Sequence, residues 1–434
     1  MITHGPYRKA QSKFLSTTNY YMHISNTYET DLQRVSGYRY VIAGLIVFLT
    51  FSSSLSIFAI GPITPLIIAD YGVTNNMAGF LTGITYLVHI MFAVPISMLI
   101  GRIGPKMLVF LGGVMGSVPL LSFMATDNFP LLLALRAVYG MSFICLFPTV
   151  GPLFMQWFPP KELPLVNGAF ALSACLAITT STFIVAPLSE AIGWEVVLSG
   201  FGGASLLSAL TWLSFGKAQR IHRKNEARSL IPLVWNVLHA RTTLLVAIAD
   251  AGPATLLTAF IAWLPTLYHE VHQISLTEAG VYTGSMSLAG LVALSLASLF
   301  TARTRNRRPF LIIPGTLAGF AGFAVLVLPD SVALYISIVV LGFACWFYLP
   351  ALLTIPMDMY PNDPNRVSII SAVLVSIGGI ACFAATPTVG AIADLTGSLL
   401  PGLAVCAVLG WSLAIAGVLM PSPSTTGTAR DREG

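Results

Sequence analysis

The chain has few charged residues and few cysteines. Only 9% of its 434 residues are charged, whereas a soluble domain carries roughly a quarter. Its five cysteines lie in apolar runs without Cys-x-x-Cys spacing, which favours a packing role over disulfides or metal binding. The sequence also lacks a P-loop, a Gly-x-Ser-x-Gly elbow and a His-Glu-x-x-His motif. We therefore expect no enzyme activity, no cofactor and no metal site.

Long apolar runs dominate what is present. Hydrophobic residues make up 56% of the chain, and the mean hydropathy is +0.81. Read in order, these runs give about twelve spans, each long enough to cross a hydrocarbon core of ~30 Å. The sequence thus predicts an all-α membrane protein with spans at 40–69, 77–100, 107–125, 130–156, 163–188, 196–215, 243–268, 278–300, 309–328, 332–357, 368–390 and 399–420.

Positive charge is distributed unevenly between the turns. When the spans are counted from the N-terminus, all but one of the 22 Lys and Arg residues fall on one side of the membrane. The opposite turns carry acids, including Asp70, Glu190 and Asp394. Because short loops rich in Lys and Arg stay in the cytoplasm, we predict cytoplasmic termini and a multi-pass protein of the cell (inner) membrane, surrounded by lipid. The basic residues lie at helix ends rather than in one patch, so we expect no nucleic-acid partner.

The two halves of the chain repeat each other. Residues 78–83 (Ala-Gly-Phe-Leu-Thr-Gly) open the second span, and residues 279–284 (Ala-Gly-Val-Tyr-Thr-Gly) open the eighth, 201 positions later. Each half has an even number of spans, so the repeat is parallel. We predict a cytoplasmic N-terminal tail (1–38), a six-helix bundle (39–216), a basic cytoplasmic linker (217–241), a second six-helix bundle (242–420) and a cytoplasmic C-terminal tail (421–434).

Proline and glycine recur inside the spans, for example at Gly61, Pro62, Pro187, Pro350 and Pro387. Proline removes a backbone donor, and in a helix bundle the freed groups are satisfied by neighbours or water. We therefore expect bends at membrane depth.

The loop after the second span carries a family signature. Residues 97–106 read Ser-Met-Leu-Ile-Gly-Arg-Ile-Gly-Pro-Lys, which resembles the major facilitator superfamily signature Gly-x-x-x-Asp-Arg-x-Gly-Arg-Lys at Arg102, Gly104 and Lys106. The position of its acid is taken by a glycine. A weaker copy after the eighth span holds Arg303 and Arg307. The resemblance covers residues 38–420 and implies two parallel six-helix bundles around a central cavity, alternating access, and a conformational latch at this loop.

Three further segments resemble branches of that superfamily. Residues 135–140 are similar to an Arg-x-x-x-Gly motif linked to proton coupling, and residues 260–270 look like the cyanate and nitroimidazole-type transporters. Residues 157–161 are similar to the nitrate/nitrite porters. The first span lacks the Asn-x-Arg-Pro of the cyanate-like group, and spans two and eight lack the arginines of nitrate porters, so small-anion specificity is not inferred. The span-five pattern of antiporters is not met by residues 185–190, which favours uptake.

Three ionisable residues lie well inside the spans: Arg136, Asp250 and His89. A charge near the bilayer centre costs ~2.5 kcal/mol or more, so each is expected to face the bundle interior. Arg136 is a candidate for bidentate binding of an anionic group, or else a structural residue bonded to carbonyls of neighbouring helices. Asp250 is a candidate proton carrier, or an acid bonded to backbone opened by Pro253. His89 is either a neutral residue bonded to a neighbour or a proton relay.

Several aromatic residues are candidates for lining a substrate cavity, the alternative being helix packing or contact with lipid. They are Tyr86, Trp263, Tyr282, Trp346 and Tyr348.

These observations predict a monomeric secondary transporter of a small molecule, with proton-coupled uptake of an anionic or anion-bearing compound as the favoured reading. The alternatives are efflux or antiport of a small apolar or cationic compound, and a non-transporting membrane sensor or partner subunit.

The predicted topology can be tested by thiol labelling. Single cysteines introduced in segments 217–241 and 268–276 should react with a membrane-impermeant reagent from opposite faces, because one segment is basic and the other acidic. Labelling of both segments from the same face would contradict the topology.

Overall fold

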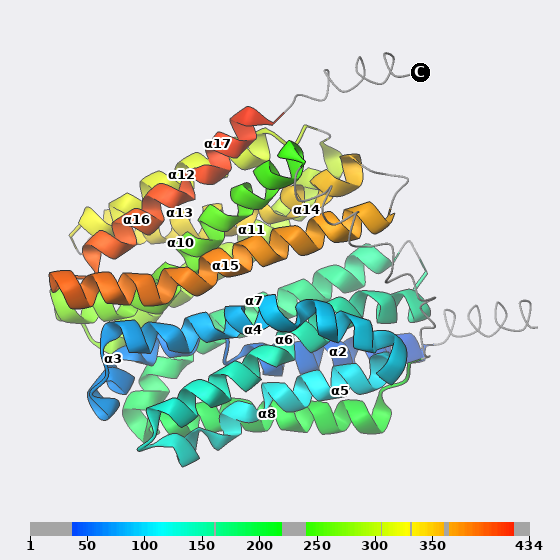
Figure 1. Cartoon of the computed structure of the whole chain (residues 1–434), viewed down its shortest axis with the longest axis horizontal. Helices are drawn as coiled ribbons and strands as arrows, with labels where there is room; N and C mark the ends of the chain where they lie inside the picture. The colour runs from blue at the N-terminus through cyan, green and yellow to red at the C-terminus, as the bar shows by residue number, and fades with distance from the viewer. Residues whose placement is uncertain are drawn as a thin grey trace, which may run out of the picture.

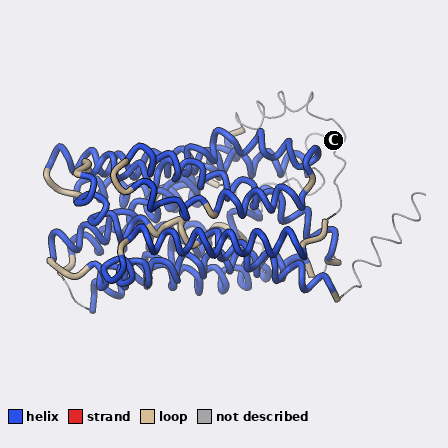
Figure 2. The backbone as a smooth tube through the Cα atoms, turned by 90° about the horizontal axis from the view of Figure 1, so that it is seen from below, coloured by secondary structure: helices blue, strands red, loops and turns tan. Residues whose placement is uncertain are grey.

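The computed structural model describes residues 37–159, 162–218, 240–304, 306–329, 332–359 and 364–420, and these residues form helices joined by short turns. Figure 1 shows their arrangement, and Figure 2 shows that the helices run along one axis with turns at both ends. The helices are α2 (Tyr38–Ser54), α3 (Ile60–Tyr71), α4 (Asn75–Ile103), α5 (Pro105–Gly116), η1 (Val118–Ala125), α6 (Phe129–Trp157), α7 (Leu163–Ile192), α8 (Trp194–Phe215), α10 (Arg241–His272), α11 (Leu276–Arg303), α12 (Pro309–Val327), α13 (Val332–Phe347), α14 (Leu349–Met359), α15 (Pro364–Thr396), α16 (Leu400–Gly410) and α17 (Ser412–Leu419).

The helices follow the predicted spans. Ten segments are long and apolar enough to cross a membrane, and Tyr38–Ser54 and Ile60–Tyr71 are shorter apolar helices. The predicted all-α membrane fold is confirmed. The tails, most of the 217–241 linker and the side chain of Arg102 lie outside the described residues.

The first predicted span, 40–69, is divided into two helices close to Gly61 and Pro62, where the sequence predicts a bend. α2 ends at Ser54 and α3 begins at Ile60. Pro62 has no N–H to donate to the carbonyl of residue 58, and it lies in the first turn of α3, where a helix tolerates a proline.

The tenth predicted span is interrupted in the same way, at Tyr348, with Pro350 the second residue of α14. By contrast, α7 and α15 continue through Pro187 and Pro387, so proline alone does not decide where a helix breaks.

The chain folds into two groups of helices that we call the N half (α2–α8) and the C half (α10–α17). Figure 1 shows the two halves close together where α3 lies, with α10, α12 and α17 leaning away from the N half toward the end where α17 finishes. We call the first of these the distal end and the second the terminal end. The main contacts between the halves pair α4 with α15, α7 with α11 and α3 with α10.

Glycines let the halves approach closely at the distal end. A Cβ atom at Gly79 of α4 would lie 2.5 Å from the carbonyl oxygen of Thr386 on α15. In the other seam, a Cβ at Gly284 of α11 would lie 2.6 Å from the ring of Phe183 on α7. Both glycines belong to the duplicated motif of residues 78–83 and 279–284. The repeat therefore builds two equivalent seams between the halves, which we call the α4–α15 seam and the α7–α11 seam.

Hydrogen bonds close the rim of each seam. The Asp394 carboxylate at the end of α15 accepts from the backbone N–H of Asn75 at 3.0 Å, from that of Asn76 at 2.9 Å, and from the Asn75 side chain at 3.0 Å. In the α7–α11 seam, the Thr277 hydroxyl donates to Glu190 at 2.8 Å. Because a helix N-terminus is positive, a carboxylate placed there is stabilised. The two halves are thus joined at the distal end.

Substituting Gly79 by alanine should open this end. The added methyl group would overlap the backbone of Thr386 and Pro387, so α4 and α15 must separate. We expect Gly79→Ala to lengthen the distance between spin labels at Thr126 and Leu395, both exposed residues at the distal end of their respective halves, as measured by pulsed electron paramagnetic resonance.

The matched control is Gly44→Ala in α2, where a Cβ would meet nothing within 4 Å. It should leave the distance distribution unchanged. A Gly79→Ala protein with the wild-type distribution would show that the seam does not hold the halves together.

Candidate functional site

Arg136 lies buried in α6 and binds the interruption of the first span. It is 3% exposed. Its guanidinium donates from Nη1 to the carbonyl oxygen of Ser56 at 2.8 Å and from Nη2 to that of Ile57 at 3.1 Å. A third bond runs from Nε to the carbonyl oxygen of Leu81 in α4, at 3.1 Å. The side chain thus ties α6 to α4 and to the turn between α2 and α3.

Tyr139, one turn further along α6, supports the same turn. Its hydroxyl donates to the carbonyl oxygen of Ser53 at 2.8 Å, and its ring lies 4.9 Å from the Arg136 guanidinium carbon. These contacts match the structural alternative for Arg136. Among the described side chains no carboxylate lies within 4.0 Å of Arg136, whereas Arg39 pairs with Glu162 at 3.1 Å. Its positive charge is therefore not neutralised by a described acid, and anion binding stays a prediction.

Tyr86 and His89 lie on α4, at the boundary between the halves. The His89 ring stacks on Phe143 at 4.9 Å and is hydrogen-bonded to the backbone of Gly140. The Tyr86 hydroxyl lies 3.3 Å from that of Thr258 in the C half. Thr258 in turn donates to the sulfur of Cys382 at 3.6 Å. A polar chain thus crosses from one half to the other at Tyr86.

Asp250 lies where three elements of the C half meet. It is 9% exposed, and its Oδ1 accepts from the Tyr348 hydroxyl at 2.9 Å. A Cβ at Gly378 of α15 would lie 2.9 Å from Asp250 Oδ2, so the glycine lets the carboxylate lie close to α15. Asp250 also lies within electrostatic range of Cys382, one turn beyond Gly378. The structure therefore brings together two of the predicted residues, Asp250 and Tyr348.

The other predicted aromatics do not converge on this region. Trp263 is buried and donates from Nε1 to the Thr386 carbonyl oxygen at 2.9 Å. Tyr282 packs its ring 5.4 Å from that of Tyr268, and Trp346 lies against Gly290. Their contacts fit the packing alternative, and a cavity-lining role stays a prediction.

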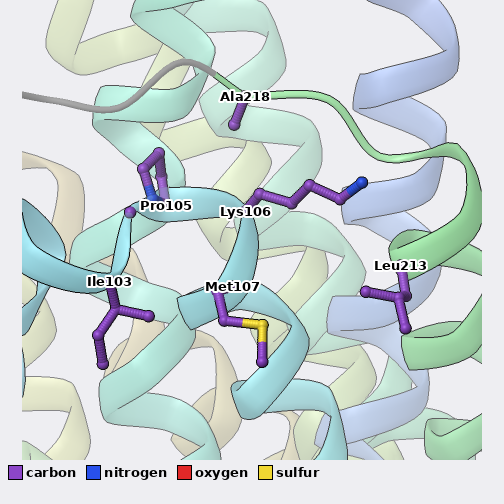
Figure 3. Close-up of a pocket in the computed structure, with 7 residues that line it drawn as sticks. Ile103, Pro105, Lys106, Met107, Leu213 and Ala218 are labelled. Atoms are coloured by element: carbon purple, nitrogen blue, oxygen red, sulfur yellow. The ribbon is translucent and has the colours of Figure 1, made fainter.

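The loop of the family signature is shaped by a glycine. Gly104 has φ of 87°, a conformation that side-chain-bearing residues rarely adopt, and Pro105 then begins α5. The Lys106 carbonyl oxygen accepts from Trp212 Nε1 of α8 at 2.9 Å. A hollow of about 190 Å³ lies beside this turn. It is lined by Ile103, Gly104, Pro105, Lys106, Met107, Leu213 and Ala218, which Figure 3 draws as sticks.

The copy of this loop in the C half ends a helix with arginines. Arg303 is the last residue of α11, and Arg307 donates from Nη1 to the carbonyl oxygens of Thr301 at 2.7 Å and Thr304 at 2.6 Å. Basic groups at a helix C-terminus satisfy its free carbonyls and its negative dipole end. A latch at this loop stays a prediction.

Sequence reasoning missed several residues that join the halves: Thr258, Asp394, Asn75 and Asn76. Thr74, Asn75 and Asn76 form a recognisable helix-start signal. Their partner Asp394 lies more than 300 positions away, and no local pattern links the two.

Comparison with known proteins supplies the family. The Major Facilitator Superfamily model matches residues 46–380. The chain belongs to the Major Facilitator Superfamily. It is a multi-pass integral membrane protein, and this family membership makes it a transporter rather than an enzyme.

Curated relatives agree with that membership. An uncharacterized protein of Campylobacter jejuni is 27% identical over 67% of this chain and 91% of its own length. The hexuronate transporter of Bacillus subtilis is 25% identical over 71% of this chain and 78% of its own. The probable sulfoacetate transporter of Cupriavidus necator is 25% identical over 66% and 70%. A quinolone resistance transporter of Acinetobacter baumannii is 22% identical over 77% and 82%.

Among solved structures, a bacterial homologue of the human lysosomal transporter Spinster, described as inward-facing and unoccupied, has a TM-score of 0.69. It is 16% identical and the match covers 88% of this chain and 95% of that one, so the likeness concerns the fold.

The bonds of Arg136 predict its effect on stability. Arg136→Lys should lower the free energy of unfolding of the ligand-free protein by roughly 2–4 kcal/mol, because an ammonium on a flexible stem cannot reach three carbonyls that the planar guanidinium spans. Tyr139→Phe, which removes one bond, should cost about 1 kcal/mol. Thermal unfolding of the purified proteins in detergent measures both, and equal melting temperatures for wild type and Arg136→Lys would rule out the structural role.

Proposed function

We propose that this transporter moves a small acidic solute into the cell by alternating access, coupled to the inward movement of protons. One observation carries the proposal: a buried cation, Arg136, lies in one half and a buried carboxyl, Asp250, in the other. The two halves touch between them through Tyr86 and Thr258.

The seams support alternating access. Their contacts include glycine-mediated backbone approach, as at Gly79, hydrogen bonds at the rim, as at Asp394, and the ring contact of Phe80 with Phe383. Such contacts break and re-form without unfolding either half. In this conformation the described contacts join the halves at the distal end, and the helices lean apart toward the terminal end (Figure 1).

The charge of Arg136 supports an acidic solute. A guanidinium buried without a neighbouring carboxylate creates a positive potential in a region of low dielectric, where it attracts anions strongly. Three of its five N–H groups are used in the bonds to carbonyls, so donors remain for a ligand. Relatives named as transporters of hexuronate and sulfoacetate are named for acidic solutes.

Asp250 supports proton coupling. Of the three ionisable residues deep in the spans it is the carboxyl, and a carboxyl changes its charge when it binds a proton. Its bond with Tyr348 and its contact with Gly378 place this change at the junction of α10, α14 and α15. A change of charge there alters how these helices pack, which is the link that symport requires.

Efflux of a planar drug-like compound is the second candidate. The observation that favours it is the relative named as a quinolone resistance transporter.

The proposed proton coupling predicts that Asp250 is required for accumulation of the solute but not for its exchange. Acids that raise the melting temperature of the purified protein are first identified, since a ligand stabilises by RT ln(1 + [L]/Kd). In proteoliposomes with an inward pH gradient, wild type should accumulate such an acid. Asp250→Asn, which mimics the protonated carboxyl, should abolish accumulation while retaining exchange of labelled for unlabelled solute.

Tyr348→Phe is the matched control, because it removes the bond to Asp250 and keeps the carboxyl. It should retain accumulation at a reduced rate. Intact accumulation by Asp250→Asn would assign Asp250 to structure. Arg136→Lys that binds every stabilising acid as tightly as wild type would contradict the anion-binding role.

A further inference from the structure

A row of five rings crosses the inner face of the N half. Tyr86 and His89 of α4 lie 5.7 Å apart between centroids, and His89 stacks on Phe143 of α6 at 4.9 Å. Phe143 stacks on Phe147 at 5.0 Å with 19° between the ring planes, and Phe147 lies 6.2 Å from Phe170 of α7. We call these five residues the aromatic row.

The row joins the two helices of the N half that contact the C half. It runs from α4 to α7, and these are the two helices of the N half that form the seams with α15 and α11. A neighbouring side of α6 packs on α5, where the Ser142 hydroxyl donates to the carbonyl oxygen of Gly112 and Leu146 closes over the same glycine. Phe143 and Phe147 lie about 100° further round α6, where they contact His89 of α4 and Phe170 of α7.

The middle of the row is left uncovered in this conformation. Phe143 is 36% exposed and Phe147 is 51% exposed. His89 is next to Ile90, which a Cβ at Gly379 of α15 would contact at 3.2 Å. Beyond that contact the row continues toward the terminal end, where the halves lean apart. The exposed parts of the Phe143 and Phe147 rings, between the helices that form the seams, offer apolar and aromatic surface to a flat ligand.

The distal end of the row is polar and positive. The Tyr86 hydroxyl is bonded to Thr258 and lies within electrostatic range of Arg136. Arg136 and Phe143 are seven residues apart on α6, which places them on one helix face at a separation of about 10 Å along the axis. A solute that lies along this face would present a ring to the phenylalanines and an acidic group toward the arginine.

We propose that the aromatic row binds the planar ring of the transported solute, so that the substrate class is an aromatic or heteroaromatic carboxylate. The proposal rests on the proposed function and narrows its substrate. Phe143 and Phe147 supply the stacking surface, and Tyr86 and His89 lie at the end that receives the acidic group.

The test compares three acids of equal charge: phenylacetate, its saturated analogue cyclohexylacetate, and the hydroxylated glucuronate. Binding to the purified full-length protein is measured from the rise of the melting temperature with ligand concentration. We expect phenylacetate to bind most tightly. The double variant Phe143→Leu with Phe147→Leu should weaken phenylacetate binding by roughly ten-fold, the size of a lost ring stack, and leave cyclohexylacetate unchanged.

Phe123→Leu is the matched control, since Phe123 is 58% exposed on η1, outside the row. It should leave all three affinities unchanged. If the double variant does not fold, Phe147→Leu alone, at the more exposed ring, serves in its place, with an expected loss of about three-fold.

The outcomes separate this proposal from the one on which it rests. Glucuronate or cyclohexylacetate binding as tightly as phenylacetate would overturn the aromatic class and leave acid transport intact. If the double variant binds all three acids more weakly by the same factor, the aromatic row would contribute to closure of the N half against the C half and not to recognition of the ring. Failure of every acid to bind would overturn the acidic substrate itself.

Discussion

Backbone carbonyls that lose their helical partners inside a membrane must find donors in the protein, and this requirement organises the N half. Each unsatisfied group in hydrocarbon costs several kcal/mol, so the interruption between α2 and α3 exists because Arg136 and Tyr139 reach it. Because the helix is interrupted, α3 can run in a different direction from α2. Gly61 at its start then lies against the backbone of Ile261 in the C half, which makes the break part of the contact between the halves.

The repeat provides two similar scaffolds with different chemistry. Arg136 has a serine, Ser337, at the position 201 residues later, and the buried acid of the C half has no acidic counterpart in the first span. Cationic and acidic groups are therefore held on separate rigid bodies. Any motion of the halves changes the distance between them, which is a physical basis for linking solute movement to charge movement.

Much of the fold could be predicted because hydropathy, loop charge and the repeat are strong local signals. Two kinds of information were missing. The Ser-rich stretch at 52–56 looked like part of a continuous span, because the donor that permits its interruption sits 80 positions away on Arg136. For Arg136 the sequence left two roles open, anion binding and bonding to carbonyls of neighbouring helices, but it could not name which carbonyls, because backbone groups carry no sequence signature. The contacts of Asp250 with Tyr348 and of Asp394 with Asn75 depend on how helices pack, and that cannot be read from either segment alone.

The two seams are related by the repeat, yet their rims are unequal. Among the described residues, Asp394 accepts three hydrogen bonds from Asn75 and Asn76 at the start of α4. Glu190 accepts one, from the Thr277 hydroxyl. When two bodies are held more firmly along one edge, they separate by rotating about that edge rather than by moving apart in parallel. If the halves separate at the distal end as proposed, the α4–α15 seam would be the axis of that rotation, and the first gap on the distal face would form between α7 and α11. A solute arriving from that face would enter along α7, the helix that carries Phe170.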